Sequence, residues 1–354
     1  MTTSAPLRTA IIGYGLGGRV FHAPLIAADP AYALVAIVTG DAERGAEAAE
    51  RYGEGVVVRD ADALFARASE LDLVVITTPN DTHAALAHRA LDAGLDVVVD
   101  KPFALTAAEA LEVIAHAEQV GRAVTVYQNR RWDGDFLTVQ ALIGSGELGE
   151  VRQFESAFEF YRPERGAKWK DRVTAEQGGG ILYDLGPHLI DQAVRLFGPV
   201  DLEHGVHAEL DVRRQGGLAD DDSFVTLQHE GGVRSRLWMS AVSPANRPRF
   251  RVVGADAVLE THGLDPQERQ ALAGMLPGDP AYGLDPEAQT AVVRTPDGGA
   301  REVAIERGSH AAFYRELASG LTAASDASTA ALPVLPVEAE HVLRIIEAAH
   351  RSAR

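Results

Sequence analysis

Short apolar runs and amphipathic stretches alternate along the first third of the chain. The apolar runs are 9–12, 34–38, 56–58, 73–77, 97–99 and 123–126. Between them, 42–52 and 82–93 have helical spacing, and Thr106-Ala107-Ala108-Glu109 is a capping box that opens a helix to about Val120. Short apolar runs between helices are typical of parallel strands buried on both faces. The pattern predicts a doubly wound α/β domain over residues 1–124.

The pattern changes after Tyr127. Helical spacing at 136–143 and 181–197 is followed by longer alternating segments at 224–229, 233–241 and 249–253. Glu230-Gly231-Gly232 and Asp297-Gly298-Gly299 are turn sequences that favour hairpins, and two helical stretches follow at 311–321 and 337–352. These features predict a second domain, 125–354, of the α+β class with a large, mainly antiparallel open sheet.

Composition narrows the chemistry that the chain can perform. With no Cys among 354 residues, disulfides, thiolate nucleophiles and Cys-ligated metals are excluded. The formal charge of -18 repels nucleic acid and anionic membrane surfaces. No apolar run reaches the roughly 18 residues that span a bilayer, and the start lacks a signal-peptide pattern. We expect a cytoplasmic protein whose partner is a small molecule, with no nucleic acid and no membrane.

Glycines cluster where the first predicted strand ends. Gly13-Tyr14-Gly15-Leu16-Gly17-Gly18 matches GxGxxG between a strand and a helical segment that starts at Arg19. Such glycines let a pyrophosphate approach backbone N–H groups at a helix N-terminus, where the helix dipole favours anions. A glycine-rich turn without a ligand is the alternative. The βαβ context favours dinucleotide binding through Gly13, Gly15, Leu16 and Gly18.

The end of the second strand bears on cofactor choice. An acidic residue there holds the ribose of NAD and repels the 2′-phosphate of NADP. Asp41 falls slightly late for that role, whereas Thr39, the Gly40 N–H and Arg44 suit a phosphate. The alternative is that Asp41 caps the next helix and Arg44 is a solvated charge. The sequence favours NADP, with NAD as the alternative.

The fourth and fifth strands also end in polar residues, at the sheet edge where such folds bind ligands. Thr78, Pro79, Asn80 and His83 follow the fourth strand, and Lys101 follows the fifth. Lys101 is one of only three lysines, with Lys168 and Lys170, among 33 basic residues. A compact ammonium suits a hydrogen bond to a reacting oxygen better than a guanidinium does. A surface lysine at a strand end is the alternative.

Asp184 and His188 lie four residues apart in the glycine-rich segment 178–191, which places them on one helix face. A histidine titrates near neutrality and accepts the proton that a hydroxyl loses on oxidation, and a nearby carboxylate orients it. The alternative is an ordinary helix-stabilising pair. Zinc at His188 with Asp191, or at His204 with His207, lacks further ligands at this spacing, so we expect no metal.

These motifs, with Asn129-Arg130-Arg131-Trp132-Asp133, together resemble the Gfo/Idh/MocA family of nicotinamide-dependent oxidoreductases over essentially the whole chain. The segments 13–26 and 129–139 look most like the branch that contains NADP-dependent scyllo-inositol dehydrogenases. The resemblance implies a Rossmann domain, then an α+β domain whose sheet forms a homodimer or homotetramer interface, with the active site between the domains. One departure is Asp100, where the family usually has Glu.

Carried over by position, the resemblance implies catalytic roles for Lys101, Asp184 and His188 and cofactor contacts for Lys101 and the residues named above. It implies oxidation of a sugar or cyclitol hydroxyl with NADP or NAD. Five residues between the two motif clusters are candidates to line the substrate site: Arg131, Trp132, Tyr161, Arg162 and Trp169. The alternative for each is packing at the domain interface. Two rival functions stay open, a glycosidase that recycles bound NAD and a non-catalytic nucleotide-binding regulator.

Overall fold

The computed structural model describes residues 5–166, 172–323 and 331–353. By their internal contacts the residues divide into two compact units. Unit 1 comprises Met1–Asn129, Glu268–Tyr282 and Ser309–Glu340, and unit 2 comprises Arg130–Gln267, Gly283–Gly308 and His341–Arg354. The division is not continuous in sequence. The boundary between residues 124 and 125 that the sequence suggests stays a prediction.

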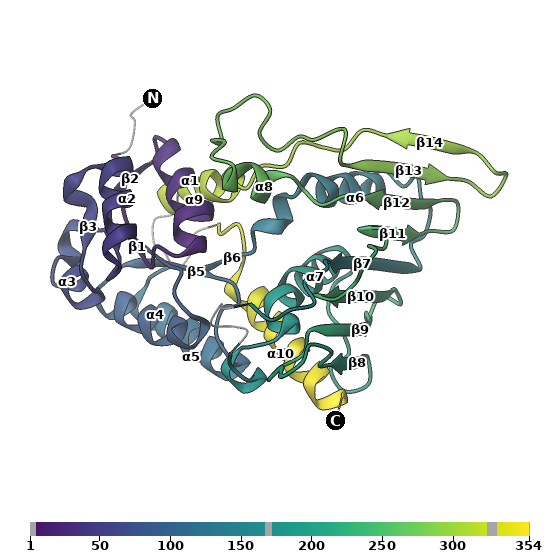
Figure 1. Ribbon diagram of the computed structural model, residues 1–354, viewed down its shortest axis with the longest axis horizontal. Coiled ribbons are helices and arrows are strands. Elements are labelled where there is room, and N and C mark those ends of the chain that lie inside the picture. Colours follow the sequence, from purple (N-terminus) through teal and green to yellow (C-terminus); the bar gives the residue numbers. More distant parts are fainter. Residues whose placement is uncertain (1–4, 167–171, 324–330, 354) are drawn as a thin grey trace. The chain divides into compact units, whose positions relative to one another are not determined.

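Unit 1 is built on a six-stranded parallel sheet in the order β3-β2-β1-β4-β5-β6 (Figure 1). Its strands are β1 (Leu7–Ile12), β2 (Tyr32–Val38), β3 (Val57–Val58), β4 (Leu73–Ile76), β5 (Asp96–Asp100) and β6 (Val124–Tyr127). Its helices include α1 (Ala23–Ala28), α2 (Ala42–Tyr52), α3 (Ala61–Phe65), α4 (His83–Asp92), α5 (Ala107–Val120) and α9 (Ala311–Ala323). This is the doubly wound domain that the sequence predicts.

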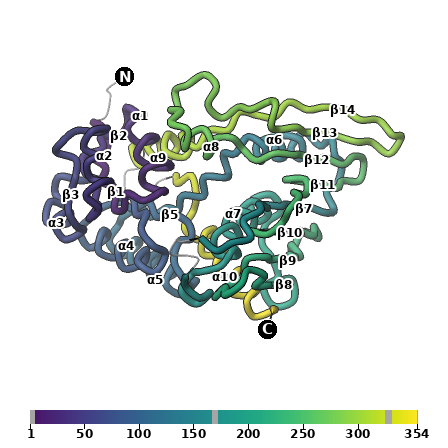
Figure 2. Tube along the Cα trace, in the orientation of Figure 1, coloured from purple at the N-terminus to yellow at the C-terminus, as the bar shows by residue number. Residues whose placement is uncertain are grey.

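Local sequence explains why these elements form. Every residue of β4 is buried, as expected for a central parallel strand covered on both faces. The predicted capping box of α5 is present, because the Thr106 side chain accepts from the Glu109 N–H and the Glu109 side chain accepts from the Thr106 N–H. Figure 2 shows α9, far away in sequence, beside α1, where Tyr314 contacts His22. The core of unit 1 therefore includes a late segment of the chain.

Unit 2 is built on an eight-stranded sheet in the order β14-β13-β12-β11-β7-β10-β9-β8 (Figure 1). The strands are β7 (Gln153–Glu159), β8 (Val206–Asp211), β9 (Asp222–Gln228), β10 (Arg234–Ser240), β11 (Phe250–Val253), β12 (Val258–His262), β13 (Thr290–Arg294) and β14 (Ala300–Val303). Its long helices are α6 (Gly134–Gly144) and α7 (Ile181–Phe197). The short α8 (Gln267–Leu272) and the C-terminal α10 (Pro336–Ser352) each have residues in both units.

Strand pairing in this second sheet confirms the predicted, mainly antiparallel α+β arrangement. Both predicted hairpins form, β9 with β10 and β13 with β14. One pair, β7 with β10, is parallel, so the sheet is mixed. None of the helices in the described part of the chain has the length and apolar character that a membrane crossing requires.

Candidate active site

Close backbone contacts shape the glycine turn after β1. A Cβ added to Gly13 would lie 2.5 Å from the Thr77 carbonyl oxygen, and one added to Gly18 would lie 2.1 Å from the Gly13 carbonyl oxygen. The turn itself therefore requires these two glycines. At Gly15, by contrast, no heavy atom of the described residues, its two chain neighbours aside, lies within 4 Å of the added Cβ. Gly15 leaves backbone open on one side of the turn, which is the space that a dinucleotide phosphate needs.

Residues after β2 show how Asp41 is used. Asp41 is the N-cap of α2, and its side chain accepts from the Arg44 N–H at 3.0 Å. The Arg44 guanidinium is about half exposed and lies 3.8 Å from the Asp41 carboxylate. Thr39 Oγ1 accepts from the Asp41 N–H at 3.3 Å. Asp41 therefore has the capping role that the sequence offers as an alternative, and the half-exposed Arg44 guanidinium lies beside its carboxylate.

His83, one of the predicted cofactor residues, is buried and ties two loops together. Its Nδ1 lies 2.8 Å from the Pro102 carbonyl oxygen, and its Nε2 lies 2.9 Å from the Thr78 carbonyl oxygen. Burial lowers the pKa of His83, although both carbonyl contacts and the nearby Asp100 oppose that shift. His83 therefore positions the loops after β4 and β5, which also carry Thr78, Pro79, Asn80 and the half-buried Lys101.

The pair Asp184 and His188 lies on α7 in unit 2, whereas Lys101 lies in unit 1. His188 is 6% exposed. Asp220, which the sequence analysis missed, holds the start of α7, because its carboxylate accepts from the Leu182 N–H at 2.8 Å and from Ser223 Oγ at 2.6 Å. Burial raises the pKa of Asp220, and these donors oppose the shift. Asp220 precedes β9, so this cap could be found only from the fold.

A buried ion pair anchors the middle of α7. Arg131 donates to both carboxylate oxygens of Asp191, at 2.8 and 2.7 Å, and both side chains are buried. Gln192, the next residue of α7 after Asp191, donates to the Arg130 carbonyl oxygen and accepts from the Arg249 guanidinium, each at 2.9 Å. The structure thus commits the Arg131 guanidinium to a protein carboxylate. Its proposed contact with substrate stays a prediction.

The other predicted substrate-wall residues have varied surroundings. Trp132 is buried at 9% exposure, and its carbonyl oxygen accepts from the Gln267 side chain at 3.2 Å. Tyr161 is 60% exposed, and the Arg162 guanidinium lies 4.9 Å from the centre of the Phe160 ring. Trp169 lies outside the described residues. Among the described members of this set, Tyr161 and Arg162 have exposed side chains.

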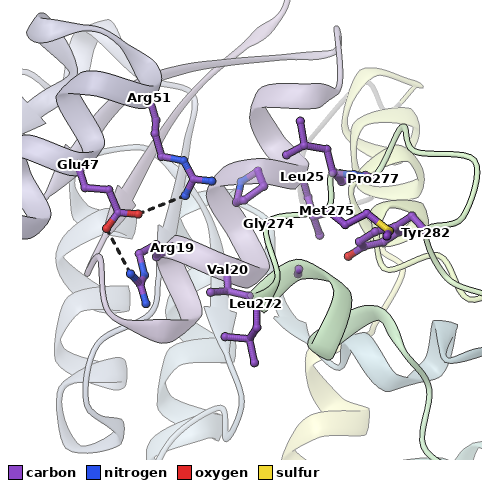
Figure 3. Close-up of a pocket in the computed structure, with 13 residues that line it drawn as sticks. Arg19, Val20, Leu25, Glu47, Arg51, Leu272, Gly274, Met275, Pro277 and Tyr282 are labelled. Atoms are coloured by element: carbon purple, nitrogen blue, oxygen red, sulfur yellow. Dashed lines mark hydrogen bonds and ion pairs between the residues drawn. The ribbon is translucent and has the colours of Figure 1, made fainter. Parts of the chain in front are cut away.

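A cavity of about 250 Å³ lies in unit 1 next to the glycine turn (Figure 3). Glu47 bridges Arg19 and Arg51 at one end, at 3.3 Å to each, and Leu25, Met275, Pro277 and Tyr282 form the other end. None of the residues predicted for the cofactor or for catalysis is among the described residues that line this cavity. The residues predicted from the sequence therefore lie elsewhere, on the glycine turn and strand ends of unit 1 and on α7 of unit 2.

Comparison with known families settles which family this chain represents. Residues 7–128 match the model of an oxidoreductase family with an NAD-binding Rossmann fold, and residues 136–260 match the GFO/IDH/MocA C-terminal domain. The chain belongs to the Gfo/Idh/MocA family. The resemblance that its motifs predict is confirmed, and with it the NAD(P)-binding Rossmann domain and the oxidoreductase class.

Relatives of this Gfo/Idh/MocA protein include sugar and inositol dehydrogenases. Scyllo-inositol 2-dehydrogenase (NADP(+)) IolW of Bacillus subtilis is 33% identical over 98% of this chain and 94% of the relative. D-apiose dehydrogenase of Paraburkholderia graminis is 30% identical over 73% of this chain and 68% of the relative. The crystal structure of an oxidoreductase from Klebsiella pneumoniae has a TM-score of 0.87 and 36% identity, covering 99% of this chain and 93% of that one.

Proposed function

We propose that this Gfo/Idh/MocA protein is an NADP-dependent dehydrogenase that reversibly oxidises a secondary hydroxyl of a sugar or cyclitol. The observation that carries the proposal is the Asp184–His188 pair on one face of a helix that Asp220 caps and Asp191 anchors. Lys101, at the end of β5 in the dinucleotide-binding unit, supplies the third polar group. The names of the inositol and apiose relatives support this substrate class.

Each residue has a defined role in this proposal. An imidazole nitrogen of His188 takes the hydroxyl proton, and the Lys101 ammonium donates a hydrogen bond to the same oxygen as negative charge develops there. Asp184 orients His188 or binds a neighbouring hydroxyl. Bound nicotinamide supplies the acceptor for the hydrogen and electron pair that leave the carbon. The glycine turn would hold the pyrophosphate through Gly13, Gly15 and Gly18, because the space at Gly15 fits it.

The experiment mixes the protein with NADP or NAD and a panel of inositols, sugars and sugar lactones, and measures the absorbance of the reduced nicotinamide. We expect reduced cofactor with at least one of them, and a loss of at least 100-fold in kcat in His188→Gln because proton transfer then lacks its base. His204→Gln is the matched control, since this histidine is in the same unit with its side chain 78% exposed. Full turnover by His188→Gln would contradict the assignment. Silence across the panel with bound cofactor would favour a rival function.

Arg44 provides the test of cofactor choice. If its guanidinium binds the 2′-phosphate, Arg44→Ala removes a charge-assisted hydrogen bond of about 1.5–3 kcal/mol. We expect KM for NADP to rise about tenfold or more while KM for NAD changes little. Arg51→Ala, two turns further along α2, is the control. Equal effects of Arg44→Ala on both cofactors would argue against NADP preference through this residue.

A further inference from the structure

His22 is a fully buried histidine that the sequence analysis did not single out. It ends a wide π-type turn, Gly17–His22, that follows the glycine motif. Its Nδ1 lies 2.6 Å from the Tyr314 hydroxyl oxygen, and its Nε2 lies 3.7 Å from Asp100 Oδ2. The Tyr127 ring packs against the imidazole with 4.3 Å between ring centres. The imidazole therefore lies between a phenol and the carboxylate that precedes Lys101.

The Asp100 carboxylate has close neighbours on several sides. Its Oδ1 accepts from the Lys101 N–H at 2.8 Å, and its Oδ2 lies 3.4 Å from Thr77 Oγ1. A Cβ on Gly17 would lie only 2.8 Å from Oδ2, so the glycine turn closes over the carboxylate. Burial by itself raises the pKa of Asp100, but His22, Lys101 and the His83 imidazole together hold it below its usual range. Asp100 is therefore an anion that accepts hydrogen bonds and donates none.

The donor and acceptor groups of Tyr314, His22 and Asp100 determine which of their atoms carry hydrogen. The Asp100 carboxylate only accepts, so the His22 ring nitrogen that faces it, Nε2, is the one that carries hydrogen. Nδ1 then accepts from the Tyr314 hydroxyl. Burial raises the pKa of Tyr314 well above its usual range, so this phenol keeps its hydrogen. The titratable groups around Tyr314, His22 and Asp100 are Tyr32, Tyr127, Lys101 and His83.

We propose that Tyr314, His22 and Asp100 form a directed hydrogen-bond chain and that His22 is a positioning residue for Lys101. The link to Lys101 is direct, because the Asp100 carboxylate accepts from the Lys101 main-chain N–H. The His22–Asp100 distance exceeds an ordinary N–H···O bond by about 0.7 Å, so a small movement of either group completes the chain. The catalytic meaning of this inference rests on the proposed function, which places Lys101 at the reacting oxygen.

Nitrogen-15 NMR of the whole protein tests the hydrogen-bond chain without a substrate, because it reports which ring nitrogen of His22 carries hydrogen. His22→Gln assigns the signal. We expect the Nε2–H form of His22 in the unmodified protein and a mixture of forms in Tyr314→Phe. Tyr32→Phe is the matched control, because the Tyr32 hydroxyl donates to the Tyr314 main-chain oxygen, at 2.6 Å, rather than to the His22 ring. An Nδ1–H form, or a His22 signal that Asp100→Asn leaves unchanged, would overturn the proposal.

Kinetics with NADP test the positioning role. We expect His22→Gln and Asp100→Asn to lower kcat at least tenfold, to displace the pH profile of kcat and to change KM for NADP less than twofold. Asp100→Glu keeps the charge and adds about 1.5 Å of reach toward His22, so it should retain most of kcat if it folds. Unchanged kcat and pH profile in His22→Gln would overturn the role. If the chain reduces no cofactor, the proposed function fails, while the NMR result still decides the hydrogen-bond chain.

Discussion

At the scale of single residues, the clearest energetic consequence concerns His83. Because burial lowers its pKa below the ordinary 6.5, the unfolded chain binds a proton that the folded chain resists as pH falls. The stability from neutral His83 is therefore fully present above pH 6.5 and is lost as pH falls below it. We expect urea unfolding of the unmodified protein to show this loss, at most about 1.4 kcal/mol per pH unit for one group.

The variant His83→Gln isolates this contribution. At pH 7.5 it should be less stable by about 1–3 kcal/mol, since the one N–H of neutral His83 donates a buried hydrogen bond to the Thr78 or the Pro102 carbonyl oxygen, and the variant weakens it. The difference from the unmodified protein should narrow toward pH 5, because glutamine does not titrate. His204→Gln, at an exposed position, should change stability little at either pH. A gap that stays constant with pH would show that His83 does not contribute in this way.

Residues differ in how far the sequence alone could assign them. Thr106 and Glu109 are recognisable because both partners of a capping box lie within four positions. The glycine motif is recognisable for the same local reason. His22 contacts Asp100, which lies 78 positions further along the chain. Asp220 contacts Leu182, which lies 38 positions before it. Such contacts leave no local pattern, so only the fold reveals them.

At the scale of elements, α7 depends on its buried ion pair. Removing one partner of such a pair leaves an uncompensated charge, which typically costs about 3–5 kcal/mol. We expect Asp191→Ala to lose that much free energy of unfolding by chemical denaturation, because the Arg131 guanidinium then lacks its carboxylate. The lost anchor should also lower kcat, since α7 carries Asp184 and His188.

The control for this prediction is a second Arg–carboxylate pair in the same unit. Arg213 and Asp222 lie 3.4 Å apart, with side chains 57% and 39% exposed. Arg213→Ala should cost at most about 1 kcal/mol, as exposed pairs contribute little. The double variant of Arg131→Met with Asp191→Leu should be more stable than Asp191→Ala. Similar small losses for both pairs would mean that the Arg131–Asp191 pair does not anchor α7.

Element boundaries were predictable where periodicity was long and regular. The predicted ranges 42–52 and 181–197 coincide with α2 and α7. The alternation in β7, β8 and β12 is shorter or interrupted by polar residues, so these strands were not predicted, and the hairpin of β13 with β14 was predicted from its turn without strand bounds. Nor does alternation reveal pairing direction. The parallel pairing of β7 with β10 is set by which strands share the core under α7, a property of the assembled sheet.

At the scale of the whole molecule, the second sheet has one face opposite α7. Met239 points toward α7, since a Cβ on Gly186 would lie 3.6 Å from its sulfur. Alternation therefore places the neighbouring Trp238 on the opposite face. There Trp238 packs against Phe224 with 5.0 Å between ring centres. Ion pairs of Arg236 and Arg251 with Glu155 lie on the same face, at 3.3 and 3.4 Å.

A face with both signs of charge around paired aromatic rings can match a second copy of itself across a two-fold axis. We propose that this face of the sheet forms a homodimer interface, and we expect light scattering to give a mass of two 37.7 kDa chains or a multiple of that pair. Trp238→Asp should dissociate the interface, because it removes a half-buried indole and adds a carboxylate near Glu155. His204→Gln is the control. It leaves the contact of Trp238 with Phe224 in place, so the mass from light scattering should not change. A monomer in the unmodified protein, or an unaltered mass in Trp238→Asp, would place association elsewhere on the molecule.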